Sequence, residues 1–143
     1  MVKLAHDSGS AIRVCCFSPS SALLASGSDD ETLVVWDIST RRKIKYVLAP
    51  PVSCSTNSLD HPIGRSSADH EAKITGCAFT PDSAFLVSCS SAGDLKLWSV
   101  KQGNVNYILT YESAHDLGVL GCDFSSQYEV NGMGNFIQLT CIK

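Results

Sequence analysis

Cysteine and histidine are the residues of this sequence whose side chains could perform catalysis or bind a metal. The 143 residues include seven cysteines and four histidines. A thiol that gives its proton to a nearby imidazole is a nucleophile, and both residue types bind zinc. However, the sequence contains no Cys-x-x-Cys pair, no Walker loop and no glycine pattern of a dinucleotide site. It therefore predicts no metal site and no cofactor.

The positions of these residues follow a repeat. Three cysteines each stand two positions before a phenylalanine, and three histidines each stand in the loop that leads into such a segment. Because the repeat accounts for them, nothing marks an exposed thiol of low pKa beside a histidine, and we predict that the chain is not an enzyme. We interpret the cysteines as small buried hydrophobic residues, held apart by the spacing between repeats in a reducing compartment. These residues are Cys15, Cys77 and Cys122, with His6, His70 and His115.

The segment from Leu23 to Asp37 predicts a β-hairpin. Residues 23–28 are mostly apolar, residues 29–32 are polar turn residues, and residues 33–37 are apolar and β-branched before they end in Trp-Asp. An apolar run closed by Ser-Pro precedes the hairpin, and residues 42–48 follow it with the composition of a further strand. The unit therefore has four strands.

The four-strand unit recurs once in full and begins a third time. Phe17 precedes Trp36 by 19 positions, and Phe79 precedes Trp98 by the same number, so the two copies align without a gap. A third start reaches Phe124, 45 positions after Phe79. A period of about 40–45 residues with four strands is typical of one propeller blade. We therefore predict an all-β fold, an incomplete β-propeller with two four-stranded blades and part of a third.

This period also predicts the organisation of the chain. Residues 1–49 form the first blade and residues 70–112 the second, with a disordered insertion rich in Ser and Pro at 50–69. The insertion is either a tolerated surface loop or a docking or phosphorylation segment. Residues 113–143 form a partial third blade with a divergent tail, in which 136–142 is an out-of-phase candidate for the second strand.

The period and the Trp-Asp ending resemble the WD-repeat family. In that family a leading-loop histidine, a Ser or Thr of the second strand, an Asp of the hairpin turn and the Trp of the third strand form a structural hydrogen-bond network. Because Ala92 stands at the place of Asp30, we expect the second network to lack its carboxylate and the first blade to be the better stabilised one. The resemblance implies His6, Ser26 or Ser28, Asp30 and Trp36 for the first network, and His70, Ser88 or Ser90 and Trp98 for the second.

The motifs CAFTPDS, SSAGDLKLW and AHDLGVLGCDFSSQ resemble, more narrowly, WD repeat, SAM and U-box domain-containing proteins. Members of that family resemble ubiquitin ligases, whose U-box contacts a ubiquitin-conjugating enzyme. No U-box occurs in these residues. The resemblance implies a non-enzymatic protein-interaction scaffold, the partner-recognition part of a ubiquitin-ligase component. The alternative is a fragment of a ubiquitin-protein transferase whose catalytic U-box is absent here.

Charge and hydropathy define the expected partners. The net charge of −3 provides no broad positive field for nucleic acid, and no segment reaches the roughly 20 apolar residues that cross a bilayer. We expect a cytoplasmic or nuclear protein that binds other proteins, and an incomplete propeller that self-associates. Loops at the rims of a propeller are suited to such binding. The candidate rim contacts are Asp7, Asp29, Glu31, Lys73 and Asp116.

Overall fold

The computed structural model of the protein describes residues 6, 9–44, 70, 72–101, 104–112, 114–124 and 139–142. The insertion expected at 50–69 and the rim candidate Asp7 lie outside the described residues. Every regular element of the described part is a β-strand. The strands are β1 (Ile12–Phe17), β2 (Leu23–Ser28), β3 (Leu33–Asp37), β4 (Arg42–Ile44), β5 (Ile74–Phe79), β6 (Phe85–Ser90), β7 (Leu95–Lys101), β8 (Asn104–Tyr111), β9 (Gly121–Phe124) and β10 (Leu139–Ile142).

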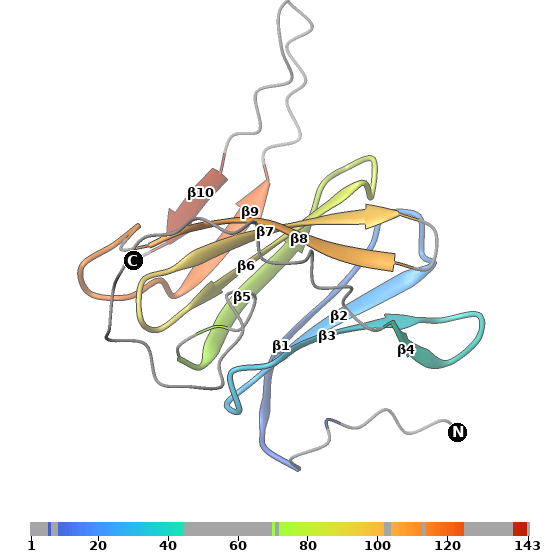
Figure 1. Cartoon of the computed structure of the whole chain (residues 1–143), viewed down its shortest axis with the longest axis horizontal. Helices are drawn as coiled ribbons and strands as arrows, with labels where there is room; N and C mark the ends of the chain where they lie inside the picture. The colour runs from blue at the N-terminus through green and yellow to red at the C-terminus, as the bar shows by residue number, and fades with distance from the viewer. Residues whose placement is uncertain are drawn as a thin grey trace, which may run out of the picture.

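The strands form antiparallel sheets in chain order. One four-stranded sheet runs β1-β2-β3-β4, a second runs β5-β6-β7-β8, and β9 pairs with β10 (Figure 1). The predicted hairpin strands at 23–28 and 33–37 agree with β2 and β3. The all-β prediction of two four-stranded sheets is confirmed.

The two large sheets repeat each other in register. Trp36 lies opposite Leu24 in the first sheet, and Trp98 lies opposite Leu86 in the second. Both sheets also have an irregularity near the start of their first strand pair. Since a shift of one residue would turn every side chain to the opposite face, the shared register gives the two sheets equivalent faces.

The sheets stack with their first strands next to one another, as blades do. β5 packs against β1 and β2 on one side and against β9 on the other. A core of Ala25, Val35, Ile74, Phe79 and Trp98, among others, fills the space between the first two sheets. A second core, which includes Val87, Cys89, Val119 and Cys122, lies between the second sheet and β9. The second blade is therefore covered on both faces.

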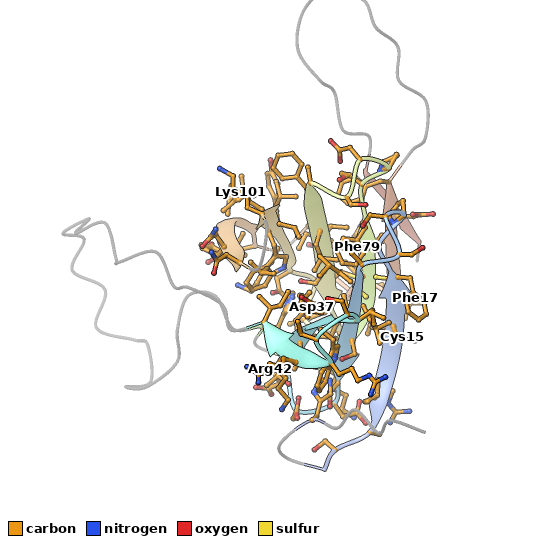
Figure 2. All side chains as sticks on the ribbon, turned by 90° about the vertical axis from the view of Figure 1, so that its right-hand side faces the viewer. Cys15, Phe17, Asp37, Arg42, Phe79 and Lys101 are labelled. Carbon is orange, nitrogen blue, oxygen red and sulfur yellow. The ribbon has the colours of Figure 1, made fainter. Side chains whose placement is uncertain are left out.

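The first blade is covered on one face only by described residues. Phe79 on β5 is 8% exposed, whereas its counterpart Phe17 on β1 is 65% exposed. Figure 2 shows Phe17 at the margin of the molecule and Phe79 among the side chains between the sheets. Ile12 on β1 differs from its counterpart on β5 in the same way: Ile12 is 48% exposed, whereas Ile74 is 0% exposed. We call Ile12, Cys15 and Phe17 the outer face of β1.

The expectation that Cys15 is buried is wrong. Cys15 is exposed, because it lies on the outer face of β1 instead of between two blades. The structure also brings Cys16, which is not one of the three recurring cysteines, to Cys77: their Sγ atoms are 3.1 Å apart. Strand alternation turns Cys16, unlike Cys15, toward the second blade.

Glycine lets the inner strands approach closely. A Cβ atom on Gly76 of β5 would lie 2.8 Å from Cys89 Sγ, 2.9 Å from the backbone nitrogen of Cys122 and 2.9 Å from Gly121 Cα. Two of these three atoms are backbone atoms of β9, so a side-chain rotation cannot move them away. Gly76 is therefore required by the contact between blades.

We predict that Gly76→Ala destabilises the chain by about 1–3 kcal/mol, because the added methyl group overpacks the junction between β5 and β9. Gly121→Ala is the matched control, since its Cβ would meet nothing within 4 Å. Urea unfolding followed by Trp fluorescence measures both free energies. Equal stability of the two variants would contradict the packing of β9 on β5.

Candidate functional site

A buried hydrogen-bond network joins the loop ahead of the second blade to its hairpin. His70 Nδ1 lies 2.6 Å from Asp94 Oδ2, and His70 Nε2 lies 2.6 Å from Ser88 Oγ. Trp98 Nε1 donates to the same hydroxyl at 2.9 Å. Because His70 and Trp98 are each only 1% exposed, these polar atoms depend on one another instead of on water.

The carboxylate of Asp94 determines the direction of the network. Because an ionised carboxylate only accepts hydrogen bonds, His70 Nδ1 carries a proton and donates it to Asp94. With that tautomer, His70 Nε2 accepts the proton of the Ser88 hydroxyl, whose oxygen accepts the Trp98 N–H. Ser90 Oγ donates to the other carboxylate oxygen of Asp94. The carboxylate thus fixes the orientation of the histidine, and with it the leading loop.

The charge of Asp94 is stabilised inside the blade. Burial raises the pKa of this carboxyl group, but the hydrogen bonds from His70 and Ser90 and the nearby charge of Lys96 contribute to lowering it by more. The net result is a pKa below the usual range. Lys96 is itself 5% exposed, and its Nζ donates to Thr110 Oγ1 at 2.9 Å.

The first blade has a longer version of this network. His6 Nε2 lies 2.8 Å from Ser26 Oγ, to which Trp36 Nε1 donates at 2.9 Å. His6 Nδ1, however, meets Thr32 Oγ1 at 3.0 Å, and the Thr32 hydroxyl donates to Asp30 Oδ1 at 2.5 Å. Asp30 Oδ1 is 3.8 Å from His6 Nδ1, so a hydroxyl stands between the histidine and its carboxylate.

The structure therefore corrects the expected distribution of carboxylates. The expectation that the second network lacks one is wrong, because Asp94 supplies it four positions before Trp98. The first network, expected to be the better one, has Thr32 at that position. The structure also decides which serine of each pair bonds the histidine: Ser26 bonds His6, and Ser88 bonds His70. Ser28 donates to the backbone oxygen of Ala11, while Ser90 donates to Asp94.

A shallow groove of about 290 Å³ lies at the rim of the first two blades. Arg13, one of its lining residues, donates two hydrogen bonds to Asp29, at 2.8 and 2.6 Å. Hydrogen bonding to Arg13 lowers the pKa of Asp29 below its ordinary value. Hydrogen bonding to Asp29 raises the pKa of Arg13 above its ordinary value. The rim groove is lined by Arg13, Asp29, Lys73, Ile74, Thr75, Ser91 and Leu120.

The rim candidates from the sequence have different positions. Asp29 and Lys73 both line the rim groove. Glu31 lies on the β2–β3 turn with a left-handed φ of 71°, and Asp116 lies on the exposed loop between β8 and β9. Sequence reasoning missed Leu120 and its neighbour Leu117. An apolar residue in a loop is a weak signal, and only the structure shows which loop residues face water.

The described residues offer little for catalysis or metal binding. Both ring nitrogens of His6 and of His70 are engaged in hydrogen bonds with side chains. Within the described ranges no group of three or more His, Cys, Asp and Glu side chains could hold a metal ion. The described part of the chain also contains no helix that is long and apolar enough to span a membrane.

Stacked four-stranded sheets, with their first strands adjacent and a His–Ser–Trp network in each, define a β-propeller repeat protein. The model of the family described as "WD domain, G-beta repeat" matches residues 2–37 and 64–99, together half of the chain. This chain belongs to the WD40 repeat family. Domains of this family are generally protein-interaction scaffolds and typically non-catalytic.

The chain is also similar to parts of longer proteins. It is 38% identical over 92 residues to Telomerase protein component 1 of Mus musculus, covering 63% of this chain and 3% of that protein. It is 39% identical over 90 residues to WD repeat, SAM and U-box domain-containing protein 1 of Danio rerio, covering 63% and 15%. The solved structure of U3-55K matches with a TM-score of 0.62 at 18% identity, over 85% of this chain and 31% of that one. The chain thus spans a small part of each protein.

We predict that Asp94→Asn lowers the free energy of unfolding by about 1.5–3 kcal/mol at pH 7, since it removes a hydrogen bond to a charged group. Thr32→Val, at the equivalent position of the first blade, removes the hydroxyl that bonds His6 and Asp30. Because the bond to Asp30 is exposed to solvent, the change should cost about 0.5–1.5 kcal/mol. Urea titration of both variants measures the difference.

The loss in Asp94→Asn should also depend on pH. Because the folded pKa of Asp94 is depressed, its contribution is complete above the ordinary carboxyl pKa of about 3.9 and is lost as the pH falls through the folded value. The two proteins should therefore converge in stability on acidification. A difference that stays constant down to pH 2 would contradict a charged Asp94.

Proposed function

We propose that this chain is a non-enzymatic scaffold that binds another protein through its rim groove. The observation that carries this proposal is the exposure of two leucines on the loop that borders the groove. Leu117 is 100% exposed and Leu120 is 67% exposed. An exposed apolar patch rimmed by polar groups is a common feature of surfaces that bind proteins.

The leucine loop is held in place by the second blade. Val119, between the two leucines, is 0% exposed; its N–H donates to the Ser90 oxygen at 3.1 Å, and its carbonyl accepts from Thr75. Gly118 has a φ of 85°, and a Cβ atom there would lie 2.4 Å from the Ser91 oxygen. The exposure of the leucines is therefore imposed by a fixed loop, which reduces the entropy lost on binding.

The charges of the rim groove indicate the chemistry of the partner. Arg13 and Lys73 contribute two positive charges, and Asp29 contributes one negative charge that Arg13 already neutralises. Lys73 is thus the cation available to a partner, beside the apolar Leu120. A protein segment with an apolar side chain close to a carboxylate fits this groove.

A more specific proposal is that this chain is the partner-recognition part of a ubiquitin-ligase component, and that the rim groove binds the partner protein. It is supported by the sequence motifs and by the 39% identity to the U-box protein, of which this chain spans 15%. The alternative is that the chain itself takes part in ubiquitin transfer. The engagement of His6 and His70 in networks favours recognition over catalysis. We also propose the expected cytoplasmic or nuclear location. It is supported by the name of one relative, the SAGA complex/transcription factor TFIID complex subunit Taf5 of Schizosaccharomyces pombe.

We predict that Lys73→Glu with Leu120→Asp weakens binding of the protein partners by tenfold or more, roughly the effect of losing 1.4 kcal/mol. The matched control is Lys101→Glu with Tyr111→Asp, which makes similar changes at exposed residues away from the groove. Partners recovered from cell extract by each protein are compared by quantitative mass spectrometry. Binding is then measured by calorimetry with each purified partner.

The outcome distinguishes the candidate functions. Loss of partners in the rim variant alone supports the rim groove, whereas equal recovery by the rim variant and the control contradicts it. The chain should also form no ubiquitin conjugates with purified activating and conjugating enzymes. Conjugates formed by this chain alone would favour the alternative of a transferase.

We further propose that the chain self-associates through the outer face of β1. The equivalent face of the second blade is covered by the first blade, so this surface is of a kind that packs against another sheet. The occupant that we propose is a second copy of the chain. Phe17, at 65% exposed, is the largest apolar contribution to this face.

We predict that Phe17→Asp shifts the chain toward monomer in sedimentation velocity, and that its thermal stability falls no further than that of wild-type chain diluted to monomer. Phe79→Asp places the same carboxylate in the buried counterpart, where it should destabilise the fold by several kcal/mol, on the order of 3–5 for a buried aromatic. A wild-type chain that is monomeric at all concentrations would contradict this association.

A further inference from the structure

Two thiols face each other across the junction of the first two blades. Cys16 belongs to β1 and Cys77 to β5, and they are 61 positions apart in the chain. Their Sγ atoms are 3.1 Å apart and share a hydrogen bond. Cys16 is half-buried and Cys77 is 7% exposed. The fold therefore forms a dithiol site that neither strand contains alone.

The two thiols differ in acidity. The hydrogen bond with Cys77 lowers the pKa of Cys16, despite partial burial and the charge of Asp123. The same hydrogen bond and burial raise the pKa of Cys77. Since the thiolate is the form that attacks a disulfide, the more accessible Cys16 is the attacking group.

We propose that Cys16 and Cys77 react with a small disulfide, glutathione disulfide, to form a disulfide bond between the first and second blades. The Cys16 thiolate attacks one glutathione sulfur, and the glutathione thiolate that leaves takes up the proton lost by Cys16. Cys77 then loses its proton and attacks Cys16 Sγ. The bond from Cys16 to glutathione breaks, and the second glutathione leaves as a thiol. The cysteines lose two electrons and the glutathione disulfide gains them.

Neighbouring cysteines provide internal controls for this reaction. Cys15 is exposed but points to the outer face of β1, so strand alternation directs its sulfur away from Cys77. It should form a mixed disulfide with glutathione and proceed no further. Cys89 shares a hydrogen bond with Cys122 across the next junction, but they are 0% and 9% exposed. That pair lacks a comparably accessible attacking thiol, so it should react more slowly.

The disulfide would link segments that are distant in sequence. Because such a bond restricts the unfolded chain, it should raise the melting temperature of the full chain, by roughly 5 °C or more. It would also fix the contact between the two blades. The proposal is independent of the rim groove, since neither thiol lines it.

The test is oxidation of the folded full chain with glutathione disulfide, followed by alkylation, proteolysis and tandem mass spectrometry. We expect a cross-linked peptide that joins Cys16 to Cys77 and disappears on treatment with dithiothreitol. Cys16→Ser and Cys77→Ser should each abolish it, whereas Cys15→Ser and Cys89→Ser should retain it. Melting temperatures of the oxidised and reduced wild-type chain are measured in parallel.

Wild-type protein alone is sufficient to overturn the proposal, so poor folding of a variant does not weaken the test. If circular dichroism shows folded wild-type chain, and Cys16 and Cys77 stay reduced or carry only glutathione while Cys15 reacts, the proposal is wrong. It is also wrong if the same cross-link forms equally fast in urea, since it would then not depend on the fold.

Discussion

The blades of this protein carry apolar residues on both sheet faces, and the packing of one blade on the next underlies the rest of the structure. A sheet of this kind is most stable when a neighbour covers each face. The second blade meets this condition, with β1 and β2 on one side and β9 on the other. The first blade meets it on one face only, and the same residue types there are exposed. Phe79 is thus buried because a neighbouring blade covers its face, and Phe17 is exposed because no described residues cover the equivalent face.

The stacked blades also provide fixed points for the rim. Each histidine network ties a leading loop to a hairpin, and buried Val119 ties the leucine loop to the second blade. These contacts hold the rim groove and its exposed leucines against a rigid core. The protein binding that we propose for this groove needs no catalytic group, because the shape of the loops and their charges would determine which protein segment fits.

Much of the fold could be predicted from the sequence because strand alternation and turn residues are local signals. The strands at Leu23–Ser28 and Leu33–Asp37 follow directly from them. Asp94 could not be placed in the same way, since the path of the turn decides which carboxylate reaches the histidine. The pairing of Cys77 with Cys16 instead of Cys15 depends on how two blades face each other, and no pattern within one strand contains that information.

The contact between the first two blades is tested most directly by nuclear Overhauser effects in the folded chain. A Cβ atom on Gly27 would lie 2.4 Å from Ile74 Cγ2, so the Gly27 α-protons and the Ile74 γ2-methyl group must be close neighbours. A strong cross-peak between them is expected. A well-dispersed spectrum with both resonances assigned and no such cross-peak would contradict the stacking of the repeats.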